Sequence, residues 1–176
     1  AFDHDGHICA AADLQGRLFL FYLQLNRYSL VSSEGADLLV NGLCFTRGQH
    51  EAVLLAVRRA VYVFSTDTQQ RTNVLCGHKH KVLTVSAAAN KDLALTQSSD
   101  LTILWNTLDW SKHRSLNECA AAMHQAVFSP LGELCGILFD DSRIALWRTA
   151  TLDFEEELIW DARGDTDLGL RLFALS

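Results

Sequence analysis

Residues 77–106 read GHKHKVLTVSAAANKDLALTQSSDLTILWN, and this stretch decides the fold of the chain. It contains three short, mainly apolar runs, separated by polar segments around Asn90 and Ser99. The runs are Val82–Ala87, Leu93–Ser98 and Thr102–Asn106. Apolar runs of this length, bounded by turn residues, are typical of β-strands, because a helix needs a longer pattern with a period of 3.6 residues. The stretch therefore predicts successive antiparallel strands that form a small sheet.

The same pattern recurs along the chain with a nearly constant period. The last apolar run of each unit ends on an aromatic ring, at Phe21, Phe64, Trp105 and Trp147, so that the spacings are 43, 41 and 42 residues. A period of about 40–45 residues is typical of the blades of a β-propeller, each of which is a small antiparallel sheet. We therefore predict an all-β propeller in which the four rings pack between neighbouring blades.

Within residues 77–106, the combination of Gly77-His78, Ser98-Ser99-Asp100 and Leu104-Trp105 resembles the WD-repeat family. The other units depart from the family pattern, since none of them keeps a Gly-His pair before its first strand. The Asp that often follows the aromatic ring in the family is absent from all four units, where the residues are Tyr22, Ser65, Asn106 and Arg148. The repeats are degenerate, so we expect aromatic packing to contribute more of the contact between blades.

The WD-repeat resemblance implies a buried chain of hydrogen bonds in the third unit, which ties the loop before its first strand to the turn before its third strand. The residues that match are His78, Thr96, Ser98, Asp100 and Trp105. Loss of one member would leave a buried polar group unpaired, at a cost of about 1–3 kcal/mol. This interpretation makes His78 and Asp100 structural, although the pair viewed alone resembles a catalytic dyad.

We predict that residues 1–176 form a single partial propeller of about four blades, which belongs to a larger ring of seven or a similar number. The approximate repeats are 1–35, 36–76, 77–119 and 120–160, with 161–176 starting a further blade. The alternative is a four-bladed ring closed by Leu168–Ser176 beside the open place near Phe2. WD-repeat rings are usually larger, and the only methionine is Met123, so the larger ring is favoured.

Composition narrows the classes of function. With 49% hydrophobic and 20% charged residues, the chain is typical of globular proteins. It has no apolar run near the ~20 residues that span a bilayer, and no charged-then-apolar leader opens it, so we expect a soluble, cytoplasmic protein without membrane insertion. The net charge is −6 and the basic residues do not gather, which argues against nucleic acid as a partner.

Cysteine spacing argues against disulfide bonds and zinc. The five cysteines lie far apart without a C-x-x-C pair, at Cys9, Cys44, Cys76, Cys119 and Cys135. Reduced cysteines inside apolar strands behave as small hydrophobic residues and fit a cytosolic compartment. His78-x-His80 alone is a poor zinc site, so we predict no metal and no cofactor.

Several short matches along the whole chain resemble a narrower family. They are Ala1-Phe2-Asp3, Gln15-Gly16, Asn26-Arg27-Tyr28, Leu30-Val31, Gly77-His78, Ser98-Ser99-Asp100 and Phe173-Ala174. They are similar to the N-terminal WD-repeat region of a TBC-domain (Rab-GAP-like) family associated with centriolar satellites and cilium assembly. The resemblance implies a protein-binding scaffold at the centrosome, centriolar satellite or ciliary base. The catalytic Arg and Gln of TBC domains have no counterpart here, so GTPase activation is not implied.

Our leading hypothesis is a non-catalytic scaffold that binds other proteins and the remaining blades of its propeller. The candidate partner surface is Arg58, Arg59, Lys79 and Lys81, because all four fall in turns. Glu155–Glu157 is a solvated loop or edge and a second candidate strip. The alternatives are peptide recognition within a ubiquitin-ligase or signalling complex, and a propeller enzyme such as a glycosidase. The enzyme is disfavoured because no spaced pair of carboxylates stands out.

Overall fold

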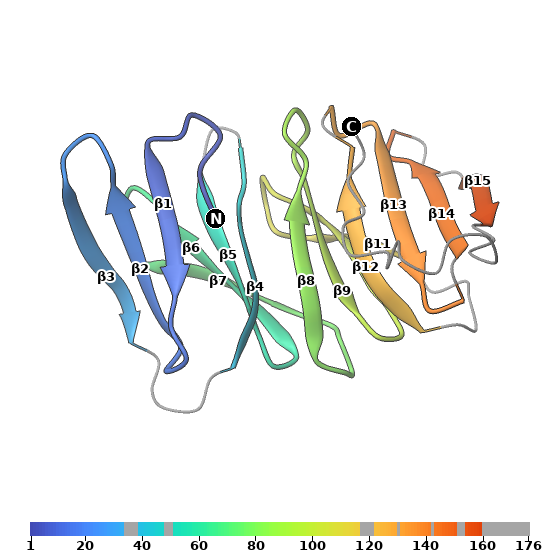
Figure 1. Cartoon of the computed structure of the whole chain (residues 1–176), viewed down its shortest axis with the longest axis horizontal. Coiled ribbons are helices and arrows are strands. Elements are labelled where there is room, and N and C mark those ends of the chain that lie inside the picture. Colours follow the sequence, from blue (N-terminus) through green and yellow to red (C-terminus); the bar gives the residue numbers. More distant parts are fainter. Residues whose placement is uncertain are drawn as a thin grey trace, which may run out of the picture.

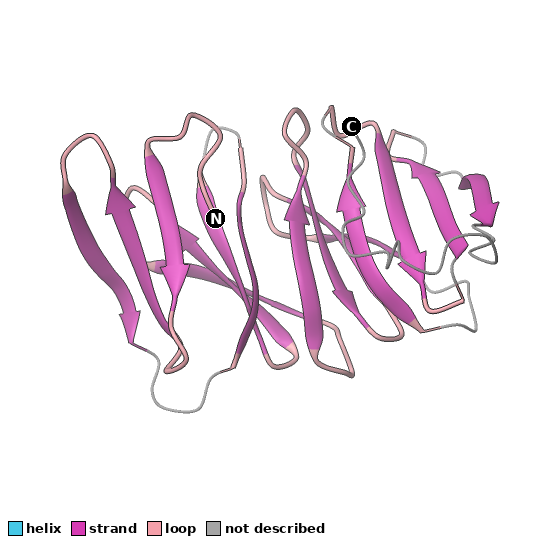
Figure 2. Ribbon diagram, in the orientation of Figure 1, coloured by secondary structure: helices cyan, strands magenta, loops and turns pink. Residues whose placement is uncertain are grey.

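The chain is all-β, as predicted. The computed structural model describes residues 1–33, 39–47, 51–116, 122–129, 131–141, 143–150 and 154–159. Within these ranges the regular secondary structure consists of β-strands alone, and the strands form four antiparallel sheets (Figure 2). Each sheet is built from strands that follow one another in the chain, as in propeller blades.

The first sheet contains β1 (Ile8–Ala12), β2 (Arg17–Tyr22) and β3 (Arg27–Ser33). The second contains β4 (Val40–Phe45), β5 (Ala52–Val57), β6 (Ala60–Ser65) and β7 (Arg71–Cys76). The third contains β8 (Val82–Ala87), β9 (Leu93–Ser98), β10 (Thr102–Asn106) and β11 (Lys112–Leu116). The fourth contains β12 (Met123–Phe128), β13 (Leu134–Phe139), β14 (Arg143–Arg148) and β15 (Phe154–Ile159).

The four sheets follow one another in a row, with the first and the fourth at opposite ends (Figure 1). The first strands of neighbouring sheets lie side by side, β1 next to β4, β4 next to β8, and β8 next to β12. Gly42 permits the close approach of β4 and β8, because a Cβ atom there would lie 3.2 Å from both the Val85 nitrogen and its Cγ2 atom. The Asn41 amide adds a direct link by donating to the Val82 carbonyl over 2.9 Å.

An apolar core fills the space between each pair of neighbouring sheets. The side chains of β6, the third strand of the second sheet, alternate between two of these cores. Val61 and Val63 pack toward the third sheet, whereas Phe64 packs toward the first. Since side chains on a strand alternate between its two faces, one strand serves both interfaces.

We call Phe21, Phe64, Trp105 and Trp147, the rings that mark the sequence repeat, the marker rings. In three of the four sheets the marker ring faces the preceding sheet. Phe64, Trp105 and Trp147 each pack into the core shared with the preceding sheet, and their exposed fractions are 2%, 4% and 4%. Phe21 occupies the equivalent position in the first sheet but is 37% exposed. Among the described residues no sheet precedes the first, so the packing of Phe21 between two blades stays a prediction.

Two further features differ from or extend the sequence analysis. β11 was not expected, because its sequence KHRSL is polar and only Leu116 is buried. The acidic Glu155–Glu157 segment lies within β15, which pairs with β14 as the last strand of its sheet. The segments 161–176 and Leu168–Ser176, on which the further blade and the four-bladed ring depended, lie outside the described residues.

Candidate functional site

The five polar residues singled out in the third sheet lie within one hydrogen-bonded chain. The indole Nε1–H of Trp105 donates to Thr96 Oγ1 over 2.8 Å, and Thr96 Oγ1 lies 2.7 Å from His78 Nε2. On the other side of the ring, His78 Nδ1 lies 2.9 Å from Ser98 Oγ. The Ser98 hydroxyl in turn donates to Asp100 Oδ1 over 2.9 Å. This network of hydrogen bonds connects the loop before β8 to the strands β9 and β10 and to the turn between these two strands.

A single neutral tautomer of His78 satisfies this whole chain. Thr96 Oγ1 accepts the indole proton and donates its own proton to Nε2, so that Nδ1 carries the ring proton and donates it to Ser98. Burial lowers the pKa of His78 from 6.5 to about 4, while the Asp100 carboxylate opposes the shift and Lys112 adds to it. The imidazole is therefore neutral at pH 7, as the arrangement requires.

The order of these contacts differs from that of a nucleophilic triad. In such a triad the His lies between the Ser and the carboxylate, whereas here Ser98 lies between His78 and Asp100. Ser98 and Thr96 have no exposed surface, and His78 is 7% exposed. The geometry suits a buried structural link and does not present a hydroxyl to a substrate.

The four basic residues singled out in turns lie on two neighbouring sheets. Arg58 and Arg59 form the turn between β5 and β6, and Lys79 and Lys81 belong to the loop between β7 and β8. The Val82 amide donates to the Arg58 carbonyl over 2.6 Å, so the two turns lie next to each other, at the lower edge of Figure 1. We call Arg58, Arg59, Lys79 and Lys81 the basic turn surface.

The side chains of the basic turn surface are exposed. Among the residues that the structure describes, none of the four has a side-chain hydrogen bond, an ion pair or a ring contact. Asp100 meets the same loop, since it accepts from Ser98 and lies 3.7 Å from Nε2 of His80, which stands between Lys79 and Lys81. The four positive charges of this surface therefore form no ion pair within the described part of the fold.

The opposite end of the second sheet is acidic. Glu51 precedes β5 there, whereas Arg58 follows β5 at the basic end. Burial raises the pKa of Glu51, and the carboxylates of Asp3, Asp5 and Asp67 raise it further. The two ends of the sheet thus differ in the sign of their charge.

The first sheet carries an aromatic face that the sequence analysis did not identify. Phe19, Phe21 and Tyr28 form a group with ring centroids 5.8–6.5 Å apart. Leu18 and Leu20 alternate with them on β2 and pack into the core shared with the second sheet. The three rings therefore point away from that core, and we call them the open face.

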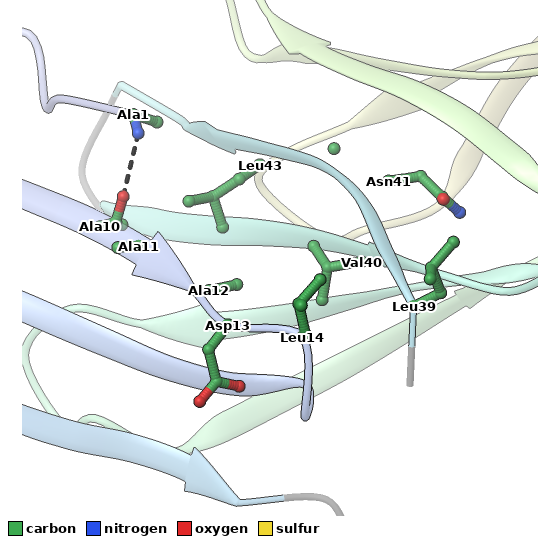
Figure 3. A pocket seen from close by; sticks show the side chains of 11 residues that line it. Ala1, Ala10, Ala11, Ala12, Asp13, Leu14, Leu39, Val40, Asn41 and Leu43 are labelled. Atoms are coloured by element: carbon green, nitrogen blue, oxygen red, sulfur yellow. Dashed lines mark hydrogen bonds between the residues drawn. The ribbon is translucent and has the colours of Figure 1, made fainter. Parts of the chain in front are cut away.

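A cavity of about 400 Å³ lies between β1 and β4. Figure 3 shows Ala10 to Leu14 on one side and Leu39 to Leu43 on the other, with the terminal amine of Ala1 donating to the Ala10 carbonyl over 2.9 Å. Residues 1–2 run beside β1 at this place, because Phe2 also pairs with Cys9. The cavity lies beside β1 of the three-stranded first sheet, whereas each of the other described sheets has four strands.

The described residues include no group of three or more His, Cys, Asp or Glu side chains placed to hold a metal ion. Four cysteines are free thiols, and Cys119 lies outside the described ranges. Burial raises the pKa of the Cys135 thiol to about 12, so it remains protonated and unreactive. The described residues include no helix long and apolar enough to span a membrane.

Comparison with known proteins supports the narrower resemblance. The chain is 29% identical over 155 residues to human TBC1 domain family member 31, and 28% identical over 179 residues to the mouse protein of that name. The chain is similar to TBC1 domain family member 31. These alignments cover 86% and 100% of the chain but only 14% and 18% of the relatives. No family model matches the chain.

A solved structure identifies the fold. A chain from the crystal structure of the mitotic checkpoint complex superposes with a TM-score of 0.71 at 13% sequence identity. The superposition covers 86% of this chain and 46% of that one. The described sheets therefore have the arrangement of propeller blades, which confirms the fold predicted from the period of about 42 residues.

Proposed function

We propose that this chain is a non-catalytic interaction module that uses a WD-repeat propeller to bind other proteins. The observation that carries the proposal is the basic turn surface, in which turns from two blades are held together by the Val82–Arg58 hydrogen bond. A row of packed sheets with exposed charged turns suits protein docking, because binding does not require the turns to be ordered first.

We further propose that the chain acts in a cytoplasmic assembly at the centrosome, centriolar satellite or ciliary base. The resemblance to the TBC-domain family supports this location, and the similarity to TBC1 domain family member 31 agrees with that resemblance. Peptide recognition in a ubiquitin-ligase or signalling complex is the alternative, and it differs only in the partner.

Proximity labelling in ciliated cells tests the proposal. The chain fused to a biotin ligase should label centrosomal or satellite proteins more strongly than the ligase alone, and its signal should overlap a centriole marker. Diffuse signal together with labelling no stronger than that of the ligase alone would contradict both the scaffold function and its location.

A further inference from the structure

The turn between β5 and β6 holds an arginine in a backbone conformation that disfavours it. Arg58 has φ +53°, a left-handed value that two-residue hairpins normally assign to Gly, Asn or Asp. A residue with a Cβ atom destabilises the turn in this conformation. Strained backbone conformations are concentrated at functional sites, so the strain at Arg58 indicates a function for its side chain.

The guanidinium of Arg58 has no role within the described fold. Elsewhere in the structure arginines are used, since Arg17 pairs with Asp13 and Arg71 lies over the Tyr62 ring. Arg58 and its neighbour Arg59 are exposed and lack a side-chain partner among the described residues. The turn that contains the strained Arg58 backbone therefore presents the guanidinium groups of both Arg58 and Arg59 to solvent.

The two basic turns are rigidly placed. β5, which ends at the Arg58–Arg59 turn, is buried at all six positions. The β7–β8 loop is anchored on one side by the buried His78 network and on the other by the bond from Val82 to Arg58. A ligand that reaches both turns meets a preformed arrangement of cations, which lowers the entropy cost of binding.

Charge selects the kind of ligand. Guanidinium groups bind carboxylates and phosphates through paired hydrogen bonds, and lysines add positive charge beside them. A long polyanion needs a continuous basic face, whereas here the surface is confined to two turns of a chain with net charge −6. A short acidic segment matches the size and the charge of the surface.

We propose that the basic turn surface binds an acidic, extended segment of a partner protein. The segment carries neighbouring carboxylates or phosphoserines, which lie across the turns of the second and third sheets. This inference rests on the proposed function, because it names the chemistry of the partner for that same interaction module.

The test uses fluorescence anisotropy with the full 176-residue chain and labelled peptides of alternating Glu and Ser. A Gln-for-Glu peptide is the neutral probe, and a version with each Ser phosphorylated compares the two anions. We expect the Glu peptide to bind and the Gln peptide not to bind. Tighter binding of the phosphorylated version would support the proposal with phosphate as the preferred anion, and weaker binding would support it with carboxylate.

Arg58→Gly separates binding from folding. Glycine adopts φ +53° without strain, so the variant should melt at or above the temperature of the wild type. It should bind the Glu peptide about five- to tenfold more weakly, as should Lys81→Gln. The matched control is Arg47→Gln, which removes an exposed positive charge from the acidic end and should change affinity less than about twofold.

Three results would overturn the inference. They are unchanged affinity in Arg58→Gly, an equal loss in Arg47→Gln, and tighter binding of single-stranded DNA than of either acidic peptide. The scaffold function would fail separately, if the wild-type chain bound the peptide but labelled no cellular protein. Cellular labelling that persists in Arg58→Gly without peptide binding at this surface would preserve the scaffold and exclude this site.

Discussion

At the scale of single residues, Thr96 is the junction of the buried network. Its hydroxyl accepts from the Trp105 indole and contacts the His78 ring, so one oxygen serves two strands and a loop. All three residues are buried. The cost of losing this oxygen is set by the two polar groups it leaves without a partner.

Thr96→Val should therefore destabilise the chain by about 2–4 kcal/mol, although it preserves the shape of the side chain. Urea unfolding measures the change in free energy. Thr72→Val is the matched control, because Thr72 is exposed and its hydroxyl makes only a 3.3 Å bond to the Val63 carbonyl. A loss no larger than that of the control would show that the network contributes nothing to stability.

Protonation of His78 should make stability depend on pH. The folded pKa is about 4, below the ordinary value of 6.5, so the unfolded chain binds the proton more readily. The stabilisation is fully present above about pH 6.5 and is lost as the pH falls toward 4. This difference corresponds to about 3 kcal/mol.

Unfolding free energies at about pH 7 and pH 4.5 check this dependence. The decrease should be smaller in His78→Gln, since glutamine does not titrate in this range. Equal decreases in the two proteins would assign the pH effect to other groups.

At the scale of the elements, the stability of each sheet depends on the neighbouring sheets that pack against its two faces. Phe64 lies between two sheets and is 2% exposed, whereas Phe21 holds the equivalent position and is 37% exposed. The two rings thus have the same place in the repeat but different burial. The difference follows from the neighbouring sheet rather than from the strand.

Phe64→Ala should cost about 3–5 kcal/mol, because it leaves a cavity in the core between the first and second sheets. Phe21→Ala should cost less than about 1.5 kcal/mol, because among the described residues no further sheet packs on the ring. Chemical denaturation of both variants compares them directly. Similar costs would mean that the two faces of the first sheet are packed alike.

The strands with apolar runs were predictable from sequence, and the polar ones were less so. β5 and β13 are apolar because both of their faces are covered. β11 was missed because an edge strand with the sequence KHRSL has no apolar pattern to mark it. Edge strands depend on backbone pairing with a neighbour, which composition does not record.

The parts of the candidate site differed in the same way. The pattern of residue types was enough to single out His78 from the sequence, and its position in a turn was enough to single out Arg58. The hydrogen bond from Val82 to Arg58 was not predictable, because it depends on the twist and spacing of two separate sheets. The open face was missed because Phe21 carries the same sequence signal as the buried marker rings.

At the scale of the whole molecule, the sheets form a row in which the marker rings of the second, third and fourth sheets each pack on the sheet before. The first sheet presents the open face where a further sheet would lie. The curated relatives are several times longer, since the chain covers 14–18% of those compared above. We expect a longer form that carries further repeats to bury the open face.

In such a longer form, Phe21→Ala should cost about 3–5 kcal/mol, as Phe64→Ala does in the present chain. Hydroxyl-radical footprinting should also show less oxidation of Phe19, Phe21 and Tyr28 in the longer form. Unchanged oxidation of the three rings would argue that the open face serves another purpose than blade packing.

Stacking of consecutive sheets is the central claim, and nuclear Overhauser effects between the Trp105 ring and β6 test it most directly. We predict cross-peaks from the indole protons to the methyl groups of Val61 or Val63 in methyl-labelled protein, because these residues share one buried core although they lie on different sheets. Cross-peaks confined to the ring's own sheet would contradict the stacked arrangement and, with it, the pairing of the two basic turns.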